Sequence, residues 1–123
     1  MKKDNDPILT ICTPTYNQED YIKQCLDSLV NQKTKYKYEI LVSDDCSTDN
    51  TRNIINEYKK KYPDKIRTIF RDKNIGPMEN LFQTLNEIHT KYVALCDGDD
   101  FWLSQDKPYT PSSLSHPARK RIQ

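Results

Sequence analysis

The sequence predicts an α/β fold with a mostly parallel sheet and helices on both faces. Short apolar runs typical of buried strands alternate with segments whose apolar residues recur at helical spacing. Turn residues separate these segments, and polar residues follow each strand-like run. Because strands that alternate with helices pair in parallel through right-handed crossovers, we expect helices on both faces of one sheet.

The first unit has a strand at Ile8 to Thr13 and a helix from about Gln18 to Gln32. Asn17 precedes this helix, and an asparagine side chain can accept a hydrogen bond from a backbone N–H group of the first turn. We therefore expect Asn17 to cap the helix. The apolar face has the spacing of a core-facing stripe and consists of Ile22, Cys25, Leu26, Leu29 and Val30.

The second unit has a strand at 38–43 and a helix at about 50–61. Pro63 follows the helix and cannot continue it, so the helix should end before this residue. Between the strand and the helix lies a polar turn that begins with two aspartates. The apolar residues expected to be buried by this helix are Ile54, Ile55 and Tyr58.

The third unit has a strand at 65–71 and a helix at about 77–89. Pro77 suits the first helical turn, where no intrahelical N–H bond is lost. A last strand at 92–96 leads directly into a group of acids. The apolar residues that repeat at helical spacing in the third helix are Met78, Leu81, Phe82, Leu85 and Ile88.

Polar residues follow all four predicted strands, at 14–17, 44–49, 71–76 and 97–100. The carboxyl ends of parallel strands meet at one edge of a sheet, and ligands of α/β proteins bind at that edge. Helix N-caps alone would place some Asp, Asn, Ser and Thr there. The loops of the opposite edge carry mostly lysine, tyrosine and proline, so the pattern favours a convergent binding site.

The last strand runs into Asp97, Asp99 and Asp100, with Gly98 among them. Three adjacent carboxylates repel one another unless a cation lies between them, and Mg²⁺ or Mn²⁺ prefers such oxygen ligands. Gly98 allows a tight turn and a close approach. The alternative is an acidic turn without a ligand, but the convergence of the other loops favours a metal site.

Composition limits the possible functions. Hydrophobic residues make up 35% of the 123 residues, charged residues 30%, and the net charge is +1. No apolar run approaches the roughly 20 residues needed to cross a bilayer. The predicted fold lacks the basic patch that a nucleic-acid-binding protein would have. We also expect the protein to lie in the cytoplasm, with its cysteines as reduced thiols. The cysteines show no metal-binding spacing and are Cys12, Cys25, Cys46 and Cys96.

Four motifs in order resemble the start of a family 2 glycosyltransferase with the GT-A fold. They are 8–17 (ILTICTPTYN), 41–51 (LVSDDCSTDNT), 74–76 (NIG) and 97–100 (DGDD), and the resemblance covers residues 8–102. It implies the Rossmann-like nucleotide-binding half of that fold. It also implies a nucleotide-sugar donor, commonly a UDP-sugar, bound with Mn²⁺ or Mg²⁺.

The resemblance also implies roles for residues of the first two motifs. Asp45 would accept a hydrogen bond from the ring N–H of uracil, whereas Asp44 and Ser47 would shape the loop around it. For Asp49, a role as a helix cap is at least as plausible. The residues that would border the base and ribose are Thr13, Pro14, Thr15 and Tyr16, with Glu19 close behind them.

In the last motif, the resemblance implies that Asp99 ligates the metal ion between the two phosphates. Asp97 would contact the ribose, the metal or a metal-bound water. Asp100 and Trp102 would lie toward the donor sugar, although ordinary packing explains Trp102 equally well. Arg71 and Asn80 are further polar residues near the same edge.

The resemblance implies glycosyl transfer to a saccharide or lipid-linked acceptor, in the synthesis of a cell-surface polysaccharide. Residues 1–102 would form the donor-binding domain, and 103–123 a disordered or aberrant basic tail, because they show no structural period. The family places the catalytic base on a later segment, so we expect a truncated fold with little transfer activity. The sequence leaves peripheral association with the inner face of the membrane open.

Three alternatives remain at the level of sequence. A sugar-phosphate nucleotidyltransferase also uses acids and Mg²⁺, but its first strand is usually followed by a glycine-rich loop, which 14–17 lacks. A receiver-like module would leave the acids at 97–100 without a role. A non-catalytic nucleotide-binding remnant is the strongest alternative, because it needs only the donor half.

Overall fold

A computed structural model describes residues 6–103, in which a four-stranded sheet alternates with helices. The strands run in the order β3-β2-β1-β4, and all neighbouring pairs are parallel. Apart from Leu103, the predicted tail at 103–123 lies outside the described residues. In chain order the elements are β1 (Leu9–Thr15), α1 (Ile22–Val30), β2 (Tyr38–Asp44), α2 (Thr51–Lys61), β3 (Ile66–Phe70), α3 (Pro77–Leu85) and β4 (Tyr92–Leu95).

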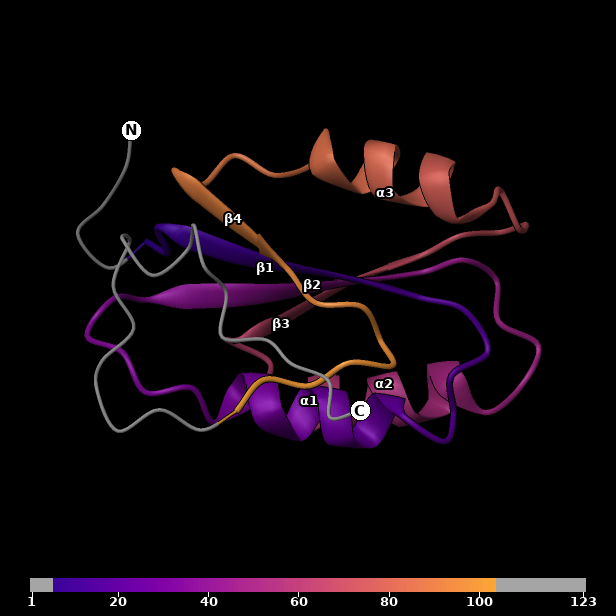
Figure 1. The fold of residues 1–123 in the computed structure, drawn as a ribbon, viewed down its shortest axis with the longest axis horizontal. Helices are drawn as coiled ribbons and strands as arrows, with labels where there is room; N and C mark the ends of the chain where they lie inside the picture. The colour runs from indigo at the N-terminus through magenta and orange to yellow at the C-terminus, as the bar shows by residue number, and fades with distance from the viewer. Residues whose placement is uncertain (1–5, 104–123) are drawn as a thin grey trace.

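The sheet is covered on both faces, as predicted. Helices α1 and α2 lie on one face, and α3 lies on the other (Figure 1). The centre of the sheet is formed by β1 and β2, so the loops after these two strands lie between the loops after β3 and β4. This order places the four carboxyl-end loops side by side.

The main hydrophobic core lies between the sheet and the pair α1 and α2. Side chains alternate along a strand, and every second residue of β1 and β2 points into this core. Fully burying an aliphatic side chain of this kind contributes about 1.5–3 kcal/mol. The largest aliphatic side chains of this core, all nearly inaccessible to solvent, are Ile11, Ile22, Leu26, Leu29, Ile40, Ile55 and Ile66.

Helix α1 begins at Ile22, four residues later than predicted, and Asn17 does not cap it. Asn17 has a φ of 48°, and its Oδ1 instead accepts hydrogen bonds from the backbone N–H groups of Thr48 (2.7 Å) and Asp49 (3.3 Å). The capping prediction is therefore wrong. The asparagine joins the loop after β1 to the loop after β2.

Helix α3 packs on the sheet through polar side chains. Asn80 and Thr84 are buried, whereas Met78 and Phe82 are 64% and 54% exposed. The helix ends at Leu85, because the backbone N–H groups of the following turn bond to carbonyls three residues back. The helical spacing of the apolar residues thus predicts the helix but not the face that it buries.

Two predicted properties concern the chain as a whole. Within residues 6–103, no helix combines the length and apolar character needed to cross a membrane. The four cysteines are free thiols. Burial, reinforced by the charge of Asp97, raises the pKa of Cys12 to about 11. This thiol therefore stays protonated at neutral pH and packs as a small apolar side chain.

Candidate nucleotide and metal site

A pocket of about 560 Å³ opens at the carboxyl edge of the sheet. This volume lies in the range of small-ligand sites. All four carboxyl-end loops contribute to it, so the predicted convergence is present in the structure. Its lining residues are Pro14 and Thr15 at the end of β1, Tyr16 and Gln18 after it, Asp45 after β2, Asn74, Pro77, Met78, Asn80 and Leu81 around the start of α3, and Asp97 and Asp99 after β4.

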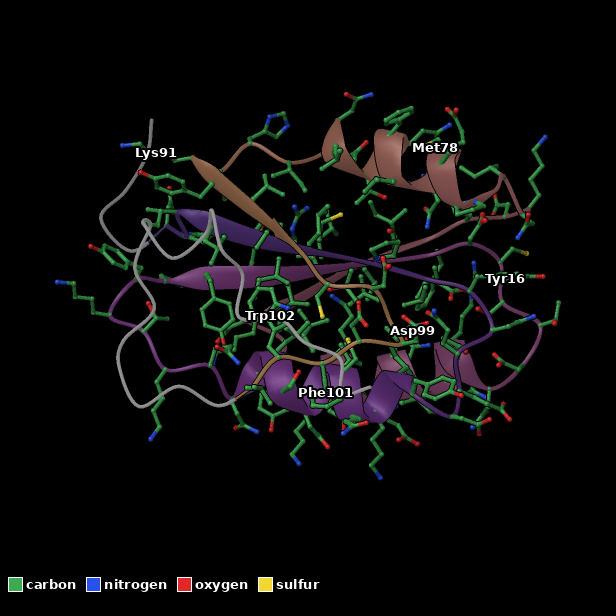
Figure 2. All side chains as sticks on the ribbon, viewed as in Figure 1. Tyr16, Met78, Lys91, Asp99, Phe101 and Trp102 are labelled. Atoms are coloured by element: carbon green, nitrogen blue, oxygen red, sulfur yellow. The ribbon has the colours of Figure 1, made fainter. Side chains whose placement is uncertain are left out.

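Acidic and apolar side chains form different parts of the wall. Tyr16, Met78 and Asp99 lie toward the same end of the molecule, whereas Lys91 lies at the other end of β4 (Figure 2). Tyr16 is 44% exposed, which leaves its ring accessible to a ligand. The pocket therefore offers apolar contact area on α3 and carboxylates opposite it.

Asp97, Asp99 and Asp100 form a compact group of possible ligands. One carboxylate oxygen of each lies within 4.8 Å of the others, and Asp97 is exposed while the other two are half-buried. The backbone N–H of Asp100 donates to the carbonyl of Asp97 (2.9 Å), which curls the loop. Three oxygen donors with partial solvent access fit Mg²⁺ or Mn²⁺, which bind few carboxylates and keep other positions for water or phosphate.

Gly98 fixes the acidic loop against the loop after β1. Its backbone N–H donates to the carbonyl of Pro14 (3.1 Å). A Cβ atom at this position would meet Oε1 of Gln18 and lie 2.8 Å from Cγ2 of Thr15, which is closer than van der Waals contact allows. Gln18 Oε1 ends a flexible side chain, but Thr15 is buried, so a side chain at position 98 would oppose the close approach of the two loops.

Asp45 is held by the loop before α3. Its Oδ1 accepts from the backbone N–H of Ile75 (2.8 Å) and its Oδ2 from that of Gly76 (2.9 Å). Asn74 Nδ2 donates to the backbone carbonyl of Asp45 (3.1 Å). Gly76 has a φ of 94°, which L-residues with a side chain rarely adopt. Asp45 as a whole residue is only 2% exposed, yet it lines the pocket. Each carboxylate oxygen can accept a further hydrogen bond besides the one from the backbone.

Asp44 is a structural acid beneath the pocket. It is fully buried and forms an ion pair with Arg52 Nε at 2.7 Å. Its carboxylate also accepts from the hydroxyls of Thr15 and Ser47, both at 2.6 Å. Arg52 in turn donates to the backbone carbonyl of Arg71. This network joins the carboxyl ends of β1, β2 and β3.

Glu19 lies outside the pocket lining, in the contact between the two helix-start loops. Its Oε1 accepts from the backbone N–H of Asn50 (2.8 Å), and its own N–H donates to Asp49 Oδ2 (3.2 Å). Desolvation disfavours the charged form of Asp49, but hydrogen bonds from Thr51 and Glu19 outweigh it and lower the pKa of Asp49. Asp49 precedes the N-cap residue Asn50, and its Oδ1 accepts from the backbone N–H of Thr51, the first residue of α2 (2.9 Å).

Thr13 and Trp102 are buried in the structure. Thr13 is fully inaccessible, and Trp102, at 2% exposure, belongs to the hydrophobic core, where its backbone N–H donates to Ser28 Oγ (3.0 Å). Neither residue lines the pocket, whereas Pro14, Thr15 and Tyr16 do. Asp100 belongs to the acid group without lining the pocket.

A pair of thiols lies behind the acidic loop. Cys25 Sγ is 3.9 Å from Cys96 Sγ and 3.5 Å from the backbone carbonyl of Asp97. The hydrogen bond with Cys96 and burial raise the pKa of Cys25 well above its usual value. Because metal ligation and nucleophilic attack require a thiolate, this neutral thiol is suited to neither.

Sequence reasoning missed several residues of the wall. The sequence pattern predicts Gln18 as part of the first helix, and it marks Met78 and Leu81 only as apolar residues at helical spacing. Their place in the pocket follows from the late start of α1 and from the polar face that α3 buries. The exposure of Met78 at 64% could not be read from helical period alone, because the period does not say which face meets the sheet.

Arg71 and Asn80 support the pocket wall from below. Arg71 Nε donates to Asn80 Oδ1 (2.9 Å), and Asn80 Nδ2 donates to the backbone carbonyl of Ser43 (3.1 Å). Asn80 is 1% exposed, so these bonds replace solvent for a buried amide. They fix α3 to the ends of β2 and β3.

Comparison with known proteins places this geometry in a family. The model of glycosyl transferase family 2 matches residues 10–109. A putative teichuronic acid biosynthesis glycosyltransferase of Bacillus subtilis, TuaG, is 34% identical over 96 residues, which are 78% of this chain and 37% of that protein. The chain spans only 27% to 37% of the length of four curated relatives, TuaG among them.

Two solved structures share the fold. Residues 1–349 of Staphylococcus aureus TarS with UDP-GlcNAc match with a TM-score of 0.66 and 31% identity, over 76% of this chain and 27% of that one. A mannosyltransferase of Pyrobaculum calidifontis with GDP-Man and Mn²⁺ matches with a TM-score of 0.69 and 27% identity, over 78% of this chain and 28% of that one. With its four-stranded parallel sheet and the matched motifs, the chain belongs to glycosyl transferase family 2.

Proposed function

We propose that this chain binds a nucleotide-sugar donor, a UDP-sugar in the first instance, together with Mn²⁺ or Mg²⁺. The proposal is based on the observation that Asp45, from the loop after β2, lines the same pocket as Asp97 and Asp99, from the loop after β4. A base needs hydrogen-bonding partners and flat contact area, and a diphosphate needs positive charge. A cation held by the acids would supply that charge.

The lining residues have distinct roles in this proposal. Asp45, already fixed by two backbone N–H groups, accepts a hydrogen bond from the ring N–H of the base. Tyr16 offers an exposed ring, and Thr15 and Pro14 border the nucleoside. Glu19 acts indirectly, by fixing the loop that carries Tyr16. Thr13 belongs to β1, is fully buried and does not line the pocket.

The acids after β4 serve the diphosphate. Asp99 and Asp97 would hold the metal ion, and Asp100 would complete the group or orient the donor sugar. A cation held there would supply positive charge for the diphosphate as it departs. Trp102 contributes by packing under the loop and not by contact with the sugar, because its side chain lies in the core.

We further propose that transfer to a saccharide or lipid-linked acceptor, in the synthesis of a cell-surface polymer, is the activity of the complete enzyme. The name of one relative, the putative teichuronic acid biosynthesis glycosyltransferase TuaG, supports a role in polymer synthesis. The chain spans 27% and 37% of two of its curated relatives, so the proposal assigns donor binding to the described residues and transfer to the whole protein. Action in the cytoplasm or at the inner face of the membrane stays a prediction.

Calorimetric titration tests donor binding. We expect UDP to bind in the presence of Mn²⁺ and to bind at least about tenfold more weakly without it, which corresponds to about 1.4 kcal/mol. Asp99→Ala should remove the dependence on Mn²⁺, because the variant loses a ligand at the centre of the acid group. GDP in place of UDP checks the base preference.

Asp64→Asn is the matched control, because Asp64 is an exposed acid on the opposite edge of the sheet. It should bind UDP and Mn²⁺ as the unchanged chain does. Equal UDP binding by the unchanged chain and by Asp99→Ala, with and without Mn²⁺, would contradict the proposed metal site. Absence of UDP and GDP binding altogether would contradict the proposed donor pocket.

A further inference from the structure

We propose that Gln18 is a positioning residue for the donor, and that its side-chain NH₂ group donates a hydrogen bond to the diphosphate. Gln18 lies in the loop after β1, lines the pocket and is half-buried. The inference rests on the proposed donor binding and adds to it a residue on the side of the phosphates.

The backbone of Gln18 is held by two elements. Its N–H donates to Thr51 Oγ1 at the start of α2 (2.8 Å). Its carbonyl accepts from the N–H groups of Tyr21 (2.9 Å) and of Ile22, the first residue of α1 (2.8 Å). A side chain on a backbone fixed in this way reaches a ligand without the entropic cost of ordering a loop.

A hydrogen bond determines the orientation of the side-chain amide. Oε1 of Gln18 accepts from the backbone N–H of Tyr16 (3.3 Å). Only the oxygen of an amide can accept from an N–H group, so the nitrogen cannot take its place. Nε2 is therefore the donor end of the side chain, and among the described residues it donates no hydrogen bond.

The amide group lies against the acidic loop. A Cβ atom at position 98 would meet Gln18 Oε1 and lie 3.2 Å from Gln18 Cδ, to which Nε2 is bonded. Gly98 stands between Asp97 and Asp99, the proposed metal ligands. Tyr16 and Asp99 lie toward the same end of the molecule (Figure 2). The NH₂ group is thus on the metal side of the pocket, where the diphosphate would bind.

The other amide side chains of the described pocket lining are engaged elsewhere. Asn80 is 1% exposed, and both its amide oxygen and its amide nitrogen form hydrogen bonds within the protein. Asn74 Nδ2 donates to the backbone carbonyl of Asp45, on the side of the proposed base contact (3.1 Å). Among these three side chains, Gln18 is the one whose donor group is available beside the acids.

An uncharged donor suits this position. A diphosphate that approaches three carboxylates is repelled by them, and a hydrogen bond from an N–H group to a charged phosphate oxygen offsets part of that repulsion. A lysine at position 18 would also attract the diphosphate, but it would repel the cation that the acids are proposed to hold. The amide of Gln18 contacts the diphosphate without competing with the metal ion.

NMR titration with UDP and with uridine, both in the presence of Mg²⁺, tests the inference, because uridine lacks the diphosphate. Gln18→Met retains the length of the side chain but cannot donate. It should weaken UDP binding about tenfold, or about 1.4 kcal/mol, and change uridine binding by less than about twofold. UDP, and not uridine, should shift the side-chain NH₂ signals of Gln18 in the unchanged chain.

Gln18→Glu is the second variant, because it keeps an oxygen that can accept from Tyr16 and replaces only the donor. Its negative charge should weaken UDP binding by more than about tenfold and leave uridine binding unchanged. Gln24→Met is the matched control, since Gln24 is exposed on α1 and does not line the pocket. It should bind both ligands as the unchanged chain does, and circular dichroism checks the folding of each variant.

The outcomes separate this inference from the proposed function. If the unchanged chain does not bind UDP, the donor pocket is contradicted and the role of Gln18 with it. If the unchanged chain binds UDP and Gln18→Met binds it equally well, only the role of Gln18 is overturned. Weakening of UDP and uridine by the same factor would also overturn that role, because Gln18 would then only support the loop that carries Tyr16.

Discussion

Contacts between neighbouring loops decide which residue types fit at some positions of the site, more than the backbone conformation of each loop does. Gly98 is an example, because its backbone has no positive φ that would exclude a side chain, whereas the neighbouring residues leave no space for one. The space for a Cβ atom is already occupied by Gln18 Oε1 and by Thr15 Cγ2, the latter at 2.8 Å. The acidic loop can approach the loop after β1 only while position 98 lacks a side chain.

Gly98→Ala should therefore destabilise the chain and displace the acids. Forcing a methyl group into a packed contact costs about 1–3 kcal/mol, which urea unfolding would measure. Mn²⁺ affinity should fall as well, because Asp97 and Asp99 flank the altered position. The second change Gln18→Ala should restore part of the stability by removing the closest atom. A Gly98→Ala variant as stable as the unchanged chain would show that the loops can separate without cost.

Neighbouring residues of the same type can have different roles. Asp44 is buried in an ion pair with Arg52, whereas Asp45 lines the pocket. Consecutive residues leaving a strand face opposite directions, so which aspartate reaches the pocket depends on the register of the sheet. The residue pattern predicts two acids at this edge, and only the family resemblance distinguishes between them.

At the level of elements, α3 reverses the usual distribution of apolar and polar residues. Asn80 is buried and bonded to Arg71 and to the carbonyl of Ser43, and Phe82 is 54% exposed. A buried amide that loses its partners costs about 1–3 kcal/mol for each group left unsatisfied. The helix is thus fixed by hydrogen bonds where a hydrophobic contact would be expected.

Asn80→Leu should accordingly destabilise the chain although it adds an apolar side chain at a buried position. We expect a loss of about 2–4 kcal/mol in urea unfolding, because Arg71 and the Ser43 carbonyl lose a partner each. Phe82→Ala, an exposed apolar change on the same helix, should alter stability by less than about 1 kcal/mol. The opposite order of the two effects would show that α3 packs through its apolar side.

Helices and strands can be predicted from the sequence where local residues define them, and their ends cannot where contacts with distant residues do. The strands β1 and β2 were predicted to within two residues, because alternation and apolar runs are local properties of the sequence. The start of α1 was missed, because Asn17 bonds to residues 31 and 32 positions further along the chain. A capping motif in the sequence cannot reveal that its side chain has a partner in another loop.

At the scale of the whole molecule, the parallel sheet brings the site together. Four loops that are distant in sequence meet at one edge because every strand runs in the same direction. Alternation of strands and helices is visible in the sequence, so the convergence of Tyr16, Asp45, Asp97 and Asp99 could be predicted from it. The apolar wall on α3 could not, because it depends on how one helix is rotated about its axis.

The central claim is that nucleotide and metal share the pocket at this edge, and residue-resolved NMR tests it most directly. Addition of UDP should shift the amide signals of Tyr16, Asp45 and Met78, and Mn²⁺ should broaden those of Asp97 to Asp100. Signals of the opposite edge, such as that of Asp64, should stay unchanged. Shifts and broadening at the opposite edge, or UDP shifts confined to residues outside the pocket, would contradict the account.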